Sequence, residues 1–477
     1  MTQTASQLLG LAPTEPRPPA ETQPVAYRRT TNPLLGDQKM KLGLFGTNCS
    51  YGLIMSHAPS TYEVSWAHTK EIAQRADELG LEALVPIARW KGFGGSTNFN
   101  GNCFETYTWA AGIAEATERI AITATSHLPT VHPIVAAKAA TTIDRISGGR
   151  FVLNLVMGWV TPEMEMFGGK QREHDERYAF GQEWIDYVTK LWTEPGSFDF
   201  EGKYFSGREV EAYPKPHQGP RPVLLNAGNS PAGIDFSARN VDINFASLDT
   251  LENIKAYTTA IRKKAREEYN RDISVMTYGL VVCRDTEDEA KRAFQQVVDE
   301  GDWGAAGNVI KIAGSGSSQS FDHAVKEFQE RFIAGWGGYP IVGTPEQVTE
   351  ELGKLNEAGM DGMIMGLIDY NEELKYLGET VLPLMREADW IIEAVTEKLE
   401  VKKQVLSRIE AWRRADAIVS TNTSGISIDE MSSHLSESFR EHFLGTHFFN
   451  PPRYMKLLEI IPGQWTKPGI IQAIGEY

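Results

Sequence analysis

The feature that most constrains the fold of this chain is an alternation of two patterns that runs from Lys39 to about residue 388. Short apolar runs of strand length alternate with longer segments in which apolar residues recur with the helical period. Strand–helix units in one unbroken series favour a parallel sheet, and eight of them are the number that closes a barrel. The predicted strands are Met40–Gly46, Leu81–Ile87, Ile120–Ser126, Phe151–Gly158, Val223–Gly228, Ile243–Ser247, Val275–Cys283 and Met363–Leu367.

Helical segments separate these strands, and one more follows the last strand. Two interruptions are long, namely Pro195–Pro222, with a hairpin-like stretch at Phe198–Phe205, and the Gly- and Ser-rich Trp303–Tyr339. Such insertions in a barrel usually build lids or substrate pockets at the carboxyl ends of the strands. The predicted helices are Glu63–Leu79, Glu105–Arg119, Pro133–Ile146, Glu176–Trp192, Pro231–Asn240, Leu251–Glu268, Glu287–Glu300, Pro345–Glu357 and Glu372–Arg386.

The two ends of the chain do not follow this pattern. Residues 1–38 hold six prolines without apolar periodicity, which predicts an extended or disordered tail. Residues 389–477 form a separate piece whose strand spacing does not continue the barrel. Its predicted strands are Trp390–Val395, Ala417–Ser420, Leu444–Phe449 and Lys456–Ile461.

Charge and cysteine content exclude several classes of function. With 47 basic and 63 acidic residues the net charge is −16, which argues against a nucleic-acid or anionic-membrane partner. No apolar run is long enough to span a bilayer, and the N-terminus lacks a signal pattern. Cys49, Cys103 and Cys283 are too few for a disulfide framework, and no pair has metal-ligand spacing. We therefore expect a cytoplasmic protein without a bound metal.

Polar residues at two strand ends are candidates for chemistry. Thr125 stands near the end of the third predicted strand, where its hydroxyl faces either a ligand or a backbone acceptor. Asn154 interrupts the apolar fourth strand, which is costly unless its amide is paired. Ligand contact and internal pairing both remain open for Asn154.

Two loops could bind an anionic ligand. Ala227–Pro231 combines glycine, a serine N-cap and a proline at the first helical position, so a helix begins there. The exposed backbone amides at this helix start suit a phosphate, although an ordinary capped helix without a ligand has the same sequence pattern. Ile87–Gly95 places basic and aromatic side chains among glycines, which fits either a loop that closes over a planar anion or a solvated surface loop.

His57 and His132 lie in predicted loops and are either acid–base groups or structural residues. The sequence contains no nucleophile elbow and no cluster of metal-ligand type.

Several motifs together resemble the bacterial luciferase-like family of flavin-dependent monooxygenases, whose fold is a TIM barrel. The resemblance covers about residues 40–388 and is strongest toward the pyrimidine monooxygenases. The end of the barrel, Val342–Pro345 through Val381–Leu384, is more similar to dimethyl sulfone and alkanesulfonate monooxygenases. The other motifs that carry the resemblance are Ser56–Pro59, Lys91–Gly95, Ile143–Phe151, Asn154–Val156, Gly158–Trp159 and Ala227–Ser230.

This resemblance implies a set of cofactor contacts. Thr125 and Asn154 match the pair that lines the oxygen pocket, and the FMN phosphate is expected near Tyr178 and Ser230. The chain departs from the family at one place, where Ala88 and Arg89 replace an isoleucine–lysine pair. The residues implied as FMN contacts are Ala88, Arg89, Asn154, Glu163, Arg177, Tyr178 and Ser230.

By the same resemblance, the expected activity uses reduced FMN and O2 to insert one oxygen atom into a small electron-poor substrate. Uracil-like rings, sulfones or sulfonates and polyhalogenated aromatics fit a flavin-N5-peroxide as oxidant. A separate NAD(P)H-dependent flavin reductase is the implied partner, since the barrel carries no dinucleotide motif. A homo-oligomer is also implied. The alternatives are a deazaflavin (F420)-dependent oxidoreductase on the same barrel and a barrel that binds flavin without catalysis.

Residues 389–463 resemble part of a second family, the 3-hydroxyacyl-CoA dehydrogenases. His447 and Glu459 match that family's catalytic pair, which Ser424 and Asn450 flank. The Gly-x-Gly-x-x-Gly loop that opens such a domain is absent, so we expect a partial Rossmann-like segment that is catalytically silent. NAD-dependent dehydrogenation by this segment is the alternative. The other matching stretches are Ile392–Val395, Glu397, Lys402, Ser420–Thr423 and His447–Pro451.

Overall fold

The computed structural model describes residues 28, 30–36, 38–248, 250–313, 329–385, 390–413, 416–423, 425–448 and 458–476. The chain divides into two compact units, Met1–Leu374 and Lys375–Tyr477. The division lies within helix α14 (Tyr370–Thr380), ahead of the boundary that we predicted after residue 388.

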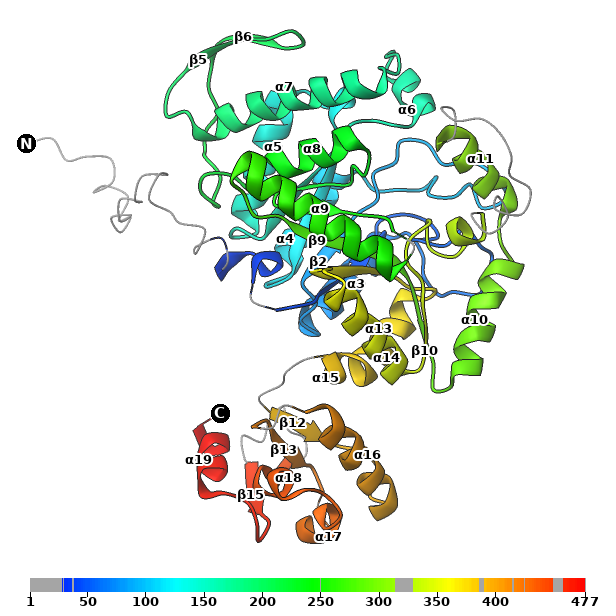
Figure 1. The fold of residues 1–477 in the computed structure, drawn as a ribbon, viewed down its shortest axis with the longest axis vertical. Coiled ribbons are helices and arrows are strands. Elements are labelled where there is room, and N and C mark those ends of the chain that lie inside the picture. Colours follow the sequence, from blue (N-terminus) through cyan, green and yellow to red (C-terminus); the bar gives the residue numbers. More distant parts are fainter. Residues whose placement is uncertain are drawn as a thin grey trace, which may run out of the picture. The chain divides into compact units, whose positions relative to one another are not determined.

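The first unit is a closed barrel of eight parallel strands surrounded by helices (Figure 1). Closure comes from β9, which pairs with β8 on one side and with β11 on the other. Every predicted barrel strand is confirmed, and so is the predicted fold class. The strands are β1 (Lys41–Phe45), β2 (Ala83–Val85), β3 (Ala121–His127), β4 (Phe151–Val156), β7 (Val223–Asn226), β8 (Ile243–Phe245), β9 (Ser274–Cys283) and β11 (Gly362–Gly366).

Local capping signals explain where the barrel helices begin. The Ser65 side chain accepts a hydrogen bond from the His68 amide, and Thr344 forms a reciprocal capping box with Gln347. Proline occupies the first helical position in α5, α8 and α13, as it commonly does. These helices are α3 (Trp66–Glu78), α4 (Thr106–Ala116), α5 (Pro133–Ile146), α7 (His174–Thr193), α8 (Pro231–Asn240), α9 (Leu251–Tyr269), α10 (Glu287–Asp299) and α13 (Pro345–Glu357).

The two long interruptions form structure of their own. The first contains the predicted hairpin, β5 (Phe198–Glu201) with β6 (Ser206–Val210), which lies beside α7 in Figure 1. Tyr187 on α7 stacks on Phe200 with ring centroids 4.1 Å apart. The second contains α11 (Trp303–Ala313), and the short strand β10 (Ile341–Gly343) follows it and pairs with β9. Two short helices, α6 (Thr161–Met166) and α15 (Leu382–Met385), and the 3₁₀ turn η3 (Leu128–Thr130) are also described.

We predicted an extended or disordered tail up to residue 38, but the described structure already begins within that segment. Residues 1–27, 29 and 37 of that tail lie outside the described residues. Its later part forms a short 3₁₀ turn, η2 (Pro33–Leu35), in which Leu34 is only 1% exposed. Leu34 joins the apolar core inside the barrel, and the Asn32 amide donates to the Phe151 carbonyl.

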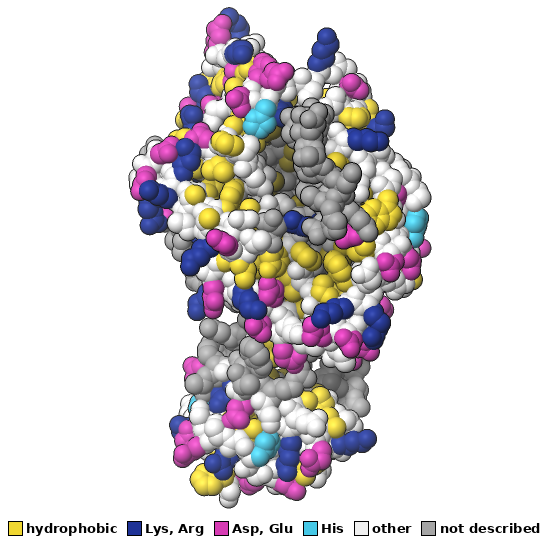
Figure 2. Space-filling model, turned by 45° about the vertical axis from the view of Figure 1, so that its right-hand side comes forward, with side chains coloured by type: hydrophobic (Ala, Val, Ile, Leu, Met, Phe, Trp, Pro, Cys, Tyr) yellow, Lys and Arg dark blue, Asp and Glu magenta, His cyan; other side chains and the backbone are white. Residues whose placement is uncertain are grey.

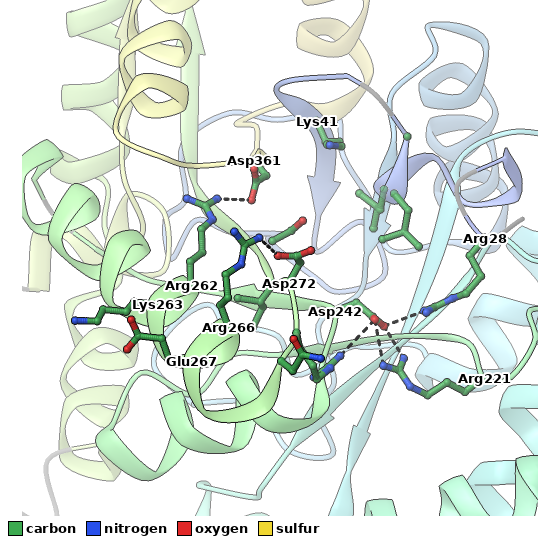
Figure 3. A pocket seen from close by; sticks show the side chains of 17 residues that line it. Arg28, Lys41, Arg221, Asp242, Arg262, Lys263, Arg266, Glu267, Asp272 and Asp361 are labelled. Atoms are coloured by element: carbon green, nitrogen blue, oxygen red, sulfur yellow. Dashed lines mark hydrogen bonds and ion pairs between the residues drawn. The ribbon is translucent and has the colours of Figure 1, made fainter. Parts of the chain in front are cut away.

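The amino ends of the strands surround a cavity of about 940 Å³ (Figure 3). Its walls are charged, and Asp242 lies 2.9 Å from Arg28 and 2.5 Å from Arg221. These two arginines hold the pKa of Asp242 below its usual range, although burial acts in the opposite direction. The Arg28–Asp242 pair joins the N-terminal segment to the barrel, and none of the predicted site residues lines this cavity. In barrel enzymes this face contributes stability rather than catalysis.

The C-terminal unit is a four-stranded sheet in the order β12–β13–β14–β15. The first three strands are parallel, and β15 is antiparallel to β14. The sheet and its helices match the predicted partial Rossmann-like segment. Its elements are β12 (Trp390–Glu393), α16 (Leu399–Trp412), β13 (Ile418–Thr421), α17 (Ile428–Ser432), α18 (Glu437–Glu441), β14 (Phe443–Phe448), β15 (Leu458–Pro462) and α19 (Pro468–Glu476).

One pair of cysteines corrects the analysis of the sequence. Cys49 and Cys103 form a disulfide, whereas Cys283 is free and buried. The two bonded residues are 54 positions apart and meet only because the loops after β1 and β2 lie side by side. Sequence spacing cannot reveal such a contact.

The surface of the described residues carries mixed charge. Acidic and basic side chains are interspersed on the face drawn in Figure 2, without a continuous basic area. Among the described helices, none is both long and apolar enough to cross a bilayer.

Candidate active site

Thr125 and Asn154 are paired across neighbouring strands near the carboxyl ends of β3 and β4. They are direct register partners, and the Asn154 Nδ2 donates to the Thr125 hydroxyl at 3.1 Å. The Thr125 hydroxyl in turn donates to the Pro86 carbonyl at 3.3 Å. The Asn154 Oδ1 is buried and has no hydrogen-bond partner among the described residues. Internal pairing thus uses half of the Asn154 amide and leaves its oxygen available to a ligand.

Arg89 and Glu163 form a buried ion pair beside this strand pair. The Arg89 Nη1 lies 3.3 Å from the Glu163 Oε1, with the two side chains 5% and 0% exposed. Glu163 also accepts hydrogen bonds from the backbone amides of Trp90 and Lys91, at 2.8 and 3.3 Å. Burial lowers the pKa of Arg89, and Glu163 opposes that shift. The Arg89 Nε has no hydrogen-bond partner among the described residues.

His127, which the sequence analysis did not select, completes this group. It is the last residue of β3, and its Nδ1 lies 3.6 Å from the Glu163 Oε2. Burial and the nearby Arg89 charge lower its pKa to about 3, so the ring is neutral at neutral pH despite the carboxylate. Like Thr125, His127 is a polar residue at the end of a predicted strand, and this position could have identified it as a candidate site residue.

Aromatic rings surround the Arg89 guanidinium. Its central carbon lies 4.8 Å from the centroid of Phe93 and 5.3 Å from that of Trp159. Phe93 and Trp159 are themselves nearly parallel, with centroids 6.1 Å apart. Trp336 contacts both rings from the segment after α11. The predicted basic and aromatic loop therefore contributes an aromatic wall to the site.

A second group of predicted residues lies where α8 begins, after β7. The Ser230 side chain caps α8 by accepting from the Gly233 amide. A Cβ atom at Gly228 would lie 2.6 Å from the Tyr178 hydroxyl, so glycine is required for this close approach. Burial raises the pKa of Tyr178, and a hydrogen bond with Ser230 opposes the shift. The predicted phosphate residues Tyr178 and Ser230 thus meet at a helix N-terminus.

Arg177 is held near this group. Its Nη1 donates to the Gly158 carbonyl at 3.0 Å, and its Nε is buried without a hydrogen-bond partner among the described residues.

A small cavity lies beside the first group. Its volume is about 60 Å³, and Ala88, Arg89, Thr125 and His127 are among the residues that line it. This is room for one or two molecules of the size of water or dioxygen, and it is far smaller than a flavin. Three residues of the first group, Arg89, Thr125 and His127, therefore line a space for a small reactant.

The two histidines proposed from the sequence have structural partners. His57 is exposed, and its Nε2 lies 2.9 Å from the Ser96 hydroxyl. His132 caps α5 by accepting from the Ile134 amide at 3.3 Å. Neither side chain lines the small cavity, so the structural interpretation is favoured for both.

Sequence analysis also missed a polar network at the ends of β7 and β8. Asn226 donates to the Leu155 carbonyl at 2.6 Å and accepts from Ser237 at 2.9 Å. Asn244 accepts from the Tyr257 hydroxyl at 2.8 Å. An asparagine in an apolar strand was the signal that selected Asn154, and it would have selected these two residues as well.

The donor and acceptor groups fit a flavin mononucleotide. Unpartnered buried atoms of Arg89, Asn154 and Arg177 offer both donors and an acceptor, which suits a heterocycle with carbonyl and amide edges. The capped helix start at Ser230 suits its phosphate.

Polar groups that meet at the carboxyl ends of barrel strands define a (β/α)₈ enzyme. Comparison with known families specifies the class. The family model "Luciferase-like monooxygenase" matches residues 41–362, and the model "3-hydroxyacyl-CoA dehydrogenase, NAD binding domain" matches residues 368–477.

Individual relatives agree with this match. An FMNH(2)-dependent dimethylsulfone monooxygenase of Pseudomonas putida is 31% identical over 358 residues, covering 74% of this chain and 97% of the relative. The pyrimidine monooxygenase RutA of Pseudomonas syringae pv. syringae is 31% identical over 360 residues, covering 72% and 96%. A crystal structure of riboflavin lyase (RcaE) shares the fold, with a TM-score of 0.67, 21% identity, and 74% and 92% of the two chains covered.

The chain therefore belongs to the luciferase-like monooxygenase family. Its barrel is that of a flavin-dependent monooxygenase, and a segment related to the NAD-binding domain of 3-hydroxyacyl-CoA dehydrogenases follows the barrel.

Proposed function

We propose that this chain is the oxygenase component of a two-component system that uses FMNH2 and O2. It inserts one oxygen atom into a small electron-poor compound such as a uracil-like ring, a sulfone or sulfonate, or a polyhalogenated aromatic. The observation that carries the proposal is the Thr125–Asn154 pair, in which Thr125 lines a small cavity and the buried Asn154 amide keeps its oxygen unpartnered. The two relatives described above act on a sulfone and on pyrimidines, according to their names.

Each residue of the site has a definite task in this proposal. When bound, the reduced flavin supplies the electrons that activate dioxygen. The Asn154 Nδ2 carries a second N–H, which would donate to dioxygen and stabilise the negative charge that develops on it, while the Thr125 hydroxyl would hold that amide in place. Tyr178 and Ser230 hold the phosphate, while Arg89, buried between two rings and paired with Glu163, orients the polar edge of the ring. The aromatic wall excludes water from the reacting atoms.

A separate NAD(P)H-dependent flavin reductase supplies the reduced cofactor in this proposal. It is supported by the name of the dimethylsulfone relative and by the lack of a Gly-x-Gly-x-x-Gly loop in the sequence. The homo-oligomer that the family implies is part of the same proposal, and light scattering on the purified chain tests it. The deazaflavin alternative has less support, because that relative is named as FMNH(2)-dependent.

The decisive experiment is a single turnover in labelled oxygen. The full chain is mixed anaerobically with reduced FMN and then with buffer that contains ¹⁸O₂ and dimethyl sulfone, uracil or a polyhalogenated phenol. One substrate is expected to yield a product that carries one ¹⁸O atom, while the rate of flavin oxidation differs from that of free FMNH2. Flavin that oxidises as it does in free solution, with no labelled product, would contradict the proposal.

A further inference from the structure

The disulfide between Cys49 and Cys103 lies at the same end of the barrel as the candidate site. Cys49 is in the loop after β1, and Cys103 is in the loop between β2 and α4. We propose that this pair is a reversible, peroxide-sensitive oxidation site in the wall of the cofactor site. The inference deepens the proposed function and rests on it for the source of the oxidant.

The surroundings of the two sulfur atoms fit the dithiol as well as the disulfide. The Ile87 carbonyl oxygen lies 3.5 Å from the Cys49 Sγ and 3.1 Å from the Cys103 Sγ. After reduction, a thiol S–H of either residue has this acceptor in place. The Asn48 Nδ2 lies 3.4 Å from the Cys103 Sγ and can donate to a thiolate there. Both redox states therefore have hydrogen-bond partners within reach of the sulfur atoms.

The two cysteines differ in access. Cys103 is half-buried and lines the small cavity together with Ala88, Arg89 and Thr125. Cys49 is fully buried, with 0% of its surface exposed. A small oxidant that enters the cavity reaches Cys103 first, and Cys49 is positioned to resolve the product. Cys283, the third cysteine, is buried in β9, and burial raises the pKa of its thiol to about 12.

The chemistry balances with hydrogen peroxide as oxidant. The Cys103 thiolate attacks one peroxide oxygen, the O–O bond breaks, and hydroxide leaves, which yields a sulfenic acid. The Cys49 thiolate then attacks that sulfur, the S–S bond forms, and a second hydroxide leaves. Two thiols lose two protons and two electrons in total, and one peroxide becomes two water molecules. Reduced flavin that reacts with O2 without transferring oxygen to a substrate supplies the peroxide.

Oxidation ties two loops of the site to each other. The hydrogen bonds of Asn48 with the backbone of Ile87 join the same loops, at 2.8 and 2.9 Å. Ile87 directly precedes Ala88 and Arg89, so the disulfide adds a covalent link next to the predicted cofactor contacts. Its reduction is expected to lower the melting temperature of the barrel by several degrees.

Thiol counting and peptide mapping on the full chain test the site itself. After full reduction and removal of reductant, the native chain receives one equivalent of hydrogen peroxide. We expect two thiols to disappear, a linked Cys49–Cys103 peptide to form, and dithiothreitol to reverse the change in the native protein. Separate alkylated peptides of Cys49 and Cys103 after peroxide, or a disulfide that dithiothreitol does not reduce, would overturn the proposal.

Variants assign the order of attack. In Cys49→Ser, Cys103 should stop at a sulfenic acid that dimedone traps, whereas Cys283→Ser, the matched control, should form the disulfide as the wild type does. Equal trapping at Cys49 in Cys103→Ser would overturn the assigned order. Wild-type peptide mapping decides the central point if a serine variant does not fold.

A final arm separates this inference from the proposed function. The reduced chain is incubated with FMNH2 and O2, without substrate, with and without catalase. Disulfide formation that catalase prevents supports the link to turnover. Suppose that added peroxide forms the disulfide but turnover with FMNH2 and O2 does not. The oxidation site is then supported, whereas the proposed function is contradicted as the source of the peroxide.

Discussion

The barrel and the C-terminal unit are both built from parallel strands and helices, but only the barrel closes its sheet. In the barrel every strand has two neighbours, and the carboxyl ends form one ring that collects Thr125, Asn154 and Arg89. In the C-terminal unit β12 pairs only with β13 among the described residues, and its Ile392 is 44% exposed. Closure thus brings the candidate site residues together, whereas the sheet of the C-terminal unit ends at β12 among the described residues.

Two buried cations, Arg150 in the barrel and Lys402 in the C-terminal unit, are held in different ways. Arg150 in the barrel donates to carbonyl oxygens of Ala114, Thr117, Ser147 and Ile120. Lys402 in the C-terminal unit instead pairs with Glu393, at 2.9 Å to both carboxylate oxygens. The charge of Arg150 is therefore shared among backbone carbonyls, whereas that of Lys402 is balanced by one carboxylate.

The largest predicted effect follows from that ion pair. Lys402→Met should destabilise the C-terminal unit by about 3–5 kcal/mol, because it leaves the Glu393 carboxylate buried and unpaired. Chemical unfolding of the full chain, followed by probes in each unit, measures this loss. Lys403→Met, one position along the same helix, is the matched control and should have little effect. If the barrel transition moved as much as the C-terminal one, the two units would not be energetically independent.

The second effect concerns the oxygen pocket of the barrel. Asn154→Ala should reduce product formation about 10²–10³-fold while FMN binding weakens only modestly, because the lost amide stabilises charge that develops during the reaction. Single-turnover product yield and an FMN titration separate the two quantities. Asn240→Ala, at the far end of α8, controls for the loss of an asparagine in the barrel. Unchanged turnover in Asn154→Ala would remove this residue from the mechanism.

The third effect is a pH dependence confined to the barrel. In the folded chain the pKa of His127 is lowered to about 3. Between pH 6.5 and 3 the His127 ring is therefore protonated in the unfolded chain but neutral in the folded chain. Above pH 6.5 this group does not change the free energy of unfolding. As the pH falls from 6.5 toward 3, that free energy decreases by at most about 1.4 kcal/mol per pH unit. His127→Gln should flatten that slope in urea unfolding. The exposed His57→Gln variant should retain it, and an equal slope in both variants would contradict the prediction.

The smallest predicted effect tests whether the C-terminal unit lacks dehydrogenase activity. The His447 Nδ1 lies 3.5 Å from the Glu459 Oε2, so the family's catalytic pair is within ion-pair distance. Ser424 and Asn450, predicted to flank it, lie outside the described residues. We expect no NADH from the full chain with NAD and a 3-hydroxyacyl-CoA, and less than a twofold change in oxygenation in His447→Ala. If the full chain forms NADH and His447→Ala abolishes it, the C-terminal unit is catalytically active, contrary to the prediction.

Strand order and helix positions were predictable because the barrel repeats one local unit. Period and capping signals are properties of neighbouring residues, and the predicted strands therefore match the observed ones. Thr125 was predictable as a hydroxyl near a strand end and Asn154 as an asparagine inside an apolar strand, and the strand register makes them partners. His127 and the cystine were missed, because a neutral buried imidazole and a disulfide over 54 positions depend on contacts between distant segments.

The amino-acid sequence by itself determined the barrel, its order of elements and the residue types at the strand ends, since these follow from local periodicity. Only the tertiary structure decided which of those residues are partnered. It left one oxygen of Asn154 available, buried Arg89 against Glu163 and two aromatic rings, and joined Cys49 to Cys103. The physical reason is that burial and hydrogen-bond pairing are set by segments that meet only when the sheet closes.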